Sequence, residues 1–128
     1  MKLLALGLVI CLLVAACGSS QGTGFSSLPA GNAANGATLF SQNVNGAPAC
    51  STCHTLDSTT LVGPGMQGYG ARAGTRVSGQ SAGEYTYNSI NSPAGFIVEG
   101  FSNVMFAQYA SKLSPQQTAD LIAYLLTL

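Results

Sequence analysis

The sequence predicts an all-α fold, a small helical domain in which extensive loops separate the helices. Three stretches begin with a residue that commonly caps the N-terminus of a helix, namely Asn32, Ser81 and Ser114. The chain between residues 63 and 79 is studded with glycine and shows no helical period. No stretch alternates apolar and polar residues as a half-buried strand would. The length of 128 residues suits a single domain.

The first 16 residues are expected to be a leader and not part of that domain. Lys2 gives a minimal positive region, and residues 3–16 form an apolar run that is too short to span a bilayer comfortably. The run ends in Val-Ala-Ala before Cys17, which resembles the lipobox of bacterial lipoprotein precursors. That resemblance implies a lipoprotein signal peptide over residues 1–16 and lipid on Cys17. The alternatives are an ordinary signal peptide cut after Ala16 and an uncleaved anchor.

Residues 17–31 are rich in glycine and serine, so we expect a lipid-anchored flexible tether, with the folded domain over residues 32–128. Only 6% of the chain is charged. Without the leader, three basic residues face four acidic ones, and they form no charge run. This composition argues against a nucleic-acid partner and against long-range electrostatic steering.

The first helix is expected to begin at Asn32 and to run through Phe40. Gly36 lies one turn before Phe40 on the same face. Because glycine lowers helix propensity, its presence there indicates a close crossing with another helix.

Residues 50–54 have the sequence Cys-Ser-Thr-Cys-His, which is a haem c attachment motif. Cys50 and Cys53 can each form a thioether with one porphyrin vinyl group, and His54 then lies under the iron as the proximal ligand. A zinc site would need four ligands, but His54 is the only histidine and no second cysteine pair remains after the leader. A redox dithiol would be expected within a βαβ pattern, which is missing. The motif therefore predicts one covalent haem c.

The rest of the chain is expected to surround this haem. After a glycine-rich loop, a second helix begins at Ser81, where Glu84 fits a capping box, and it ends before Pro93. Residues 94–111 form another loop. The last helix begins at Ser114, with Pro115 at its first position, and Gln117 completes a second capping box; its apolar stripe is Leu121, Ile122 and Leu125.

The second axial ligand of the iron cannot be a histidine, which leaves Met66, Met105 or an open position. Met66 follows His54 by only twelve residues, so we expect it on the proximal side, filling the core. Met105 lies in a loop just before the last helix, where it can reach the opposite face. We therefore expect His54 and Met105 to bind the iron.

Taken together, residues 32–128 resemble a class I c-type cytochrome. The matching features are Gly36, Phe40, the motif at residues 50–54, Gly63, Pro64, Met105, Leu121 and Tyr124. The resemblance implies that the first and last helices cross at the glycine and aromatic positions. It also implies that the carbonyl of Pro64 accepts a hydrogen bond from the proximal histidine, and that Met105 is the distal ligand.

Residues 89–93, 97–101 and Met105 are similar to a narrower group of membrane-associated monohaem cytochromes, which accompany membrane oxidases or the quinol-oxidising alternative complex III. This similarity implies an electron carrier, not itself an enzyme, in a respiratory or photosynthetic chain. Its partners would be redox proteins of a membrane complex, at the extracytoplasmic (periplasmic) face of a bacterial membrane. The alternative is a haem protein with an open or labile distal site, either a gas sensor or a small redox enzyme.

Two departures from the family pattern bear on the site. Phe106 follows Met105 where the family usually has proline, so the loop that carries the methionine is expected to be more mobile. The chain also has no tryptophan, and the haem propionates need other donors, for which Arg72 is our first choice. The other candidate donors are Tyr69, Tyr85, Tyr87 and Asn103.

Overall fold

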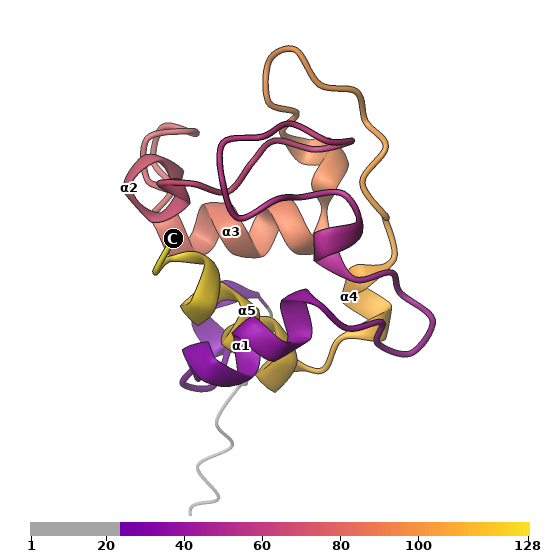
Figure 1. Cartoon of the computed structure of the whole chain (residues 1–128). Coiled ribbons are helices and arrows are strands. Elements are labelled where there is room, and N and C mark those ends of the chain that lie inside the picture. The colour runs from indigo at the N-terminus through magenta and orange to yellow at the C-terminus, as the bar shows by residue number, and fades with distance from the viewer. Residues whose placement is uncertain (1–23) are drawn as a thin grey trace, which may run out of the picture.

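The computed structural model describes residues 24–128, which form short helices joined by long loops (Figure 1). The α-helices are α1 (Ala33–Phe40), α2 (Tyr69–Ala73), α3 (Ala82–Asn91), α4 (Tyr109–Lys112) and α5 (Pro115–Leu125). The 3-10 helices are η1 (Phe25–Ser27), η2 (Cys50–Thr52) and η3 (Pro93–Gly95). Within residues 24–128 there is no strand, and a single β-bridge joins Val44 to Ala47. The all-α prediction is confirmed.

The helix starts that the sequence predicts are present, and their caps show why. The Asn32 side chain accepts hydrogen bonds from two backbone N–H groups of the first turn of α1. At α5, Ser114 and Gln117 form both bonds of a capping box. At α3, the Ser81 hydroxyl accepts from the backbone N–H of Glu84, but the return bond from the glutamate is not formed. These contacts satisfy backbone donors that would otherwise lack partners.

The crossing of α1 over α5 is the centre of the lower layer in Figure 1. A Cβ atom added to Gly36 would overlap the backbone carbonyl of Asp120, so only glycine permits this approach. Beside it, the rings of Phe40 and Tyr124 meet edge to face with centroids 5.8 Å apart. Phe40 and Leu121 are each only 2% exposed. The close crossing that the sequence predicts at Gly36 is confirmed.

Two helices were not expected from the sequence. Helix α2 lies within the glycine-rich stretch that we predicted to be loop, and α4 begins within the predicted loop of residues 94–111 and ends one residue after it. Both are too short to be stable alone, so tertiary contacts must hold them. The N–H of Gly70 in α2 donates to the carbonyl of Leu128 (3.1 Å), and Tyr109 in α4 is buried in the core. Such partners leave no periodic pattern in the sequence.

Residues 24–31, which the sequence predicts to be part of a flexible tether, pack against the domain. The ring of Phe25 lies against Gly83 and 6.3 Å from the ring of Tyr87, both on α3. The Gln116 side chain donates to the carbonyl of Ala30 (2.9 Å). The prediction is therefore wrong for residues 24–31. The predicted signal peptide (residues 1–16), the lipidation site Cys17 and the rest of the tether lie outside the described residues.

Among residues 24–128, no helix is both long enough and apolar enough to cross a membrane.

Candidate haem-binding site

The attachment motif folds as a single 3-10 turn, η2, that brings its two cysteines and its histidine to one cavity. The N–H groups of Cys53 and His54 both donate to the carbonyl of Cys50, at 3.1 and 3.0 Å. Both thiols are free and half-buried, and both line the cavity. Burial raises the pKa of the Cys50 thiol to about 11. A raised pKa keeps the Cys50 thiol protonated at neutral pH.

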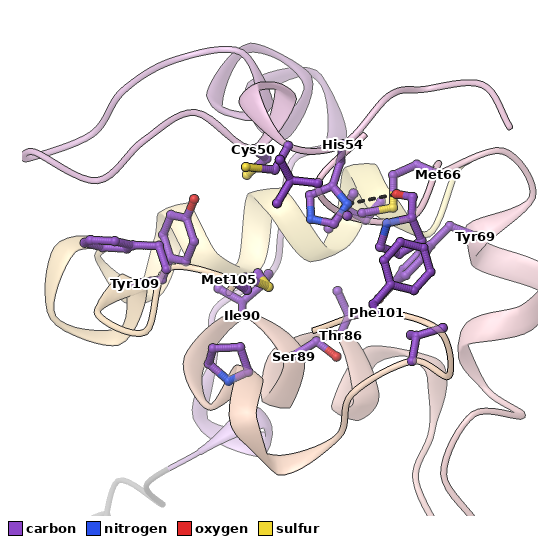
Figure 2. Close-up of a pocket in the computed structure, with 18 of the residues that line it drawn as sticks. Cys50, His54, Met66, Tyr69, Thr86, Ser89, Ile90, Phe101, Met105 and Tyr109 are labelled. Atoms are coloured by element: carbon purple, nitrogen blue, oxygen red, sulfur yellow. Dashed lines mark hydrogen bonds between the residues drawn. The ribbon is translucent and has the colours of Figure 1, made fainter. Parts of the chain in front are cut away.

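The His54 ring is held in one orientation by the backbone of the next loop. Its Nδ1 lies 2.9 Å from the carbonyl oxygen of Pro64 (Figure 2). A carbonyl can only accept, so Nδ1 carries the hydrogen and Nε2 keeps its lone pair. The bond leaves Nε2 turned away from Pro64 and available to a metal ion. The loop itself is tied down by the N–H of Gly63, which donates to the carbonyl of Cys53 (2.9 Å).

Gly63 leaves no room for a side chain between its backbone and the imidazole ring. A Cβ atom built on it would overlap the His54 ring carbon Cε1 and crowd Nδ1. The backbone of this residue is not in the left-handed region, so the constraint is one of space alone. Backbone on one side and the Pro64 carbonyl at its edge thus fix the ring.

We expect Gly63→Ala to push the imidazole out of this position. The methyl group cannot fit beside the ring, so the His54–Pro64 bond should lengthen or break, with a cost of about 1–3 kcal/mol in the free energy of unfolding. The measurement is the visible spectrum, the reduction potential and denaturant unfolding of the haem-loaded protein. Gly95→Ala is the matched control, because a Cβ there meets nothing within 4 Å. Equal behaviour of the two variants would contradict the steric role of Gly63.

The two candidate methionines reach the cavity from different parts of the chain. Met66 is 8% exposed, belongs to the hydrophobic core and donates its backbone N–H to the carbonyl of Thr55 (2.9 Å), directly after His54. Met105 is half-buried and comes from the loop before α4. Figure 2 shows Met66 beside His54 and Met105 on the other side of the cavity.

Arg72, on α2, lines the cavity and also braces the loop that orients His54. Its guanidinium donates to the carbonyl of Gly65 (2.6 Å) and to the carbonyl of Gln67. These acceptors lie one and three residues after Pro64, so the arginine stabilises the segment that holds the histidine. Three of its five N–H groups remain for another acceptor. Its role toward the haem propionates stays a prediction.

The other expected propionate donors differ in what they can offer. The Thr86 hydroxyl donates to the carbonyl of Ala82 (2.7 Å), so it must accept from Tyr69 (2.9 Å), and the only proton of Tyr69 is therefore committed. Burial raises the pKa of Tyr69 to about 12, which keeps that proton in place. Tyr87 packs against Phe25 and does not line the cavity.

Tyr85 and Asn103 do line the cavity and remain candidates. Sequence reasoning did not select Arg76, which also lines the cavity. Within residues 24–128, its side chain makes no hydrogen bond or ion pair with another residue. A second arginine only four residues after Arg72 was the signal that could have identified it.

The cavity as a whole suits a large flat apolar ligand with charged groups at its edge. Its volume is about 370 Å³, within the range of small-molecule sites. The walls come from α3, α5 and the loops on either side, and most of the lining side chains are apolar or aromatic. The two thiols, the imidazole and the two arginines are among the few polar groups. A porphyrin attached through two thioethers fits this set of donors.

A comparison with protein-family models supplies the independent test. The family model described as cytochrome c matches residues 33–128. No curated protein matches the chain. Cytochrome c domains are typically extracytoplasmic. The geometry of residues 50–64 and the extent of the family match lead to one conclusion: the chain belongs to the cytochrome c family, with one covalent haem c and a function in electron transfer.

Proposed function

We propose that the protein is a membrane-tethered one-electron carrier whose haem iron is bound by His54 and Met105. It would work as a subunit or close satellite of a respiratory or photosynthetic electron-transfer complex. The observation that carries the proposal is the arrangement in Figure 2, where the free nitrogen of His54 and the thioether of Met105 border one cavity from opposite sides. Met66, the competing methionine, is packed in the core beside the histidine.

The haem supplies the one-electron Fe(II)/Fe(III) couple, and the protein determines how that couple is used. His54 and Met105 would together hold the iron and leave no position on it for a substrate, and a methionine ligand would raise the reduction potential. The apolar walls would limit the access of water to a bound haem. The Pro64 carbonyl restrains the imidazole to one orientation, which would limit the geometric change that accompanies electron transfer.

Apolar side chains at the cavity suit brief contact with a partner. Val62, Phe96, Ile97 and Val104 are exposed and line the cavity, and few charges lie nearby. Small interfaces of this kind bind weakly. A lipid anchor would offset that weakness, because it confines both proteins to one membrane surface and raises their effective concentration.

The experiment that tests the proposal is carbon monoxide binding to the reduced, haem-loaded protein at neutral pH. Occupied axial positions should make binding slow or undetectable. Prompt binding would instead favour the alternative, a gas sensor or small redox enzyme with an open or labile distal site. Haem staining of a denaturing gel comes first, and a result without covalent haem would exclude both readings.

Cys17→Ser tests the proposed membrane anchor. We expect the variant to leave the membrane fraction and to appear in the soluble extracytoplasmic fraction, because it lacks the sulfur that would carry lipid. The measurement is fractionation followed by haem staining. Continued tight membrane binding would argue for an uncleaved leader in place of a lipid.

A further inference from the structure

The loop that carries Met105 lacks the proline usual in the family, and an aromatic pair stands in its place. Phe106 is half-buried, and its ring meets the ring of Tyr109 edge to face, with centroids 5.1 Å apart and planes at 76°. This is a favourable aromatic geometry. The residue after the candidate ligand is therefore packed against α4.

Tyr109 also contacts the segment just before the attachment motif. It is 6% exposed, and its hydroxyl donates to the carbonyl of Pro48 (2.8 Å), two residues before Cys50. Figure 2 shows this hydroxyl turned toward the side of the cavity that holds Cys50. Burial raises the pKa of Tyr109 above its ordinary range, so the hydroxyl remains a donor at all physiological pH values.

Helix α4 also contacts the loop that precedes Cys50 at a second point. The Asn45 side chain donates to the carbonyl of Lys112, the last residue of α4, at 2.8 Å. The loop is in turn closed by the side chain of Asn43, which accepts from the N–H of Ala49 (2.8 Å). Helix α4 and the segment before Cys50 thus form one connected body, to which Phe106 attaches the Met105 loop.

We propose that Phe106 is a positioning residue that, through Tyr109 and Pro48, holds the Met105 loop against the haem-attachment segment and so determines how often the distal position opens. The inference rests on the proposed His54/Met105 ligation and adds the element that controls it. Proline would stiffen the loop by restricting the backbone of the open state. The Phe106–Tyr109 pair instead stabilises the state in which Met105 is in place, because its contacts must break before the Met105 loop can move away.

Phe106→Ala should therefore make Met105 easier to displace. We expect imidazole to bind the oxidised haem protein roughly two- to tenfold more tightly, the range that loss of one aromatic pair implies. The methionine-to-iron charge-transfer band should weaken in parallel. Tyr109→Phe, which keeps the ring and loses the bond to Pro48, should change imidazole affinity in the same direction.

A conservative replacement provides the rescue. Within residues 24–128 the N–H of Phe106 donates no backbone hydrogen bond and its φ angle is not positive, so Phe106→Pro removes no backbone bond and meets no left-handed backbone. We expect this variant to bind imidazole more weakly than Phe106→Ala, because the loop is stiffened by another means.

Phe25→Ala is the matched control. It removes a different aromatic pair, Phe25–Tyr87 at 6.3 Å, which lies away from the cavity. It should lower the melting temperature and leave imidazole affinity unchanged. If Phe106→Ala behaves in the same way, the positioning role is wrong and Phe106 is packing alone. If Met105→Ala fails to increase imidazole affinity, the assignment of Met105 as ligand fails instead.

Discussion

Met105→Ala is expected to abolish the low-spin spectrum of the haem-loaded protein. Removal of the thioether opens one axial position, so the reduced protein should bind carbon monoxide promptly. Its reduction potential should fall, because the methionine that raises the potential is lost. The measurement is the visible spectrum of both oxidation states, followed by redox titration.

Met66→Ala is the matched comparison, since it removes the same side chain from the other side of the cavity. Met66 is 8% exposed and part of the core, so its loss should cost roughly 2–5 kcal/mol of unfolding free energy. Its spectrum should remain that of the wild type. The reverse pattern, in which only Met66→Ala loses the low-spin state, would show that Met66 is the ligand.

Gly36→Ala should destabilise the whole domain. The added Cβ would overlap the carbonyl of Asp120 and crowd Cβ of Tyr124, so α1 must move away from α5. The same crossing holds the bond from the N–H of Asn32 to the Asp120 carboxylate (2.7 Å), which would also be disturbed. We expect this collision to cost about 1–3 kcal/mol in the free energy of unfolding. The better helix propensity of alanine should offset up to about 1 kcal/mol of that cost.

Denaturant unfolding of the haem-loaded protein measures this effect, and Asn35→Ala is its control. Asn35 precedes Gly36 on α1 and is exposed, so alanine there adds helix propensity without a collision. It should leave stability unchanged or slightly raised. A Gly36→Ala variant as stable as Asn35→Ala would mean that the helices can separate without cost.

Local chemistry made the main features of this protein predictable from sequence. The caps at Asn32 and Ser114 act within three residues of themselves, so the pattern that predicts them is also the set of atoms that forms them. The same holds for the attachment turn at residues 50–54, whose spacing alone predicts a covalent haem. Gly36 was informative for a different reason: a residue that weakens its own helix must be needed by a neighbour.

Other features depended on tertiary contacts that no sequence pattern predicts. Residues 24–31 look flexible in composition, yet Phe25 packs on α3. The sequence suggested Arg72 for the propionates, and the fold also uses it to brace the loop beside His54. Helices α2 and α4 have too few residues to form without tertiary partners.

By itself, then, the sequence determined the fold class, the haem motif and the ends of the longer helices, because these arise from chemistry between residues a few positions apart. Only the tertiary structure decided which residues pack against the Met105 loop. The Tyr109–Pro48 bond joins residues 61 positions apart, and the Asn32–Asp120 bond joins residues 88 apart. Such partners are selected by packing of the folded chain, which no local pattern encodes.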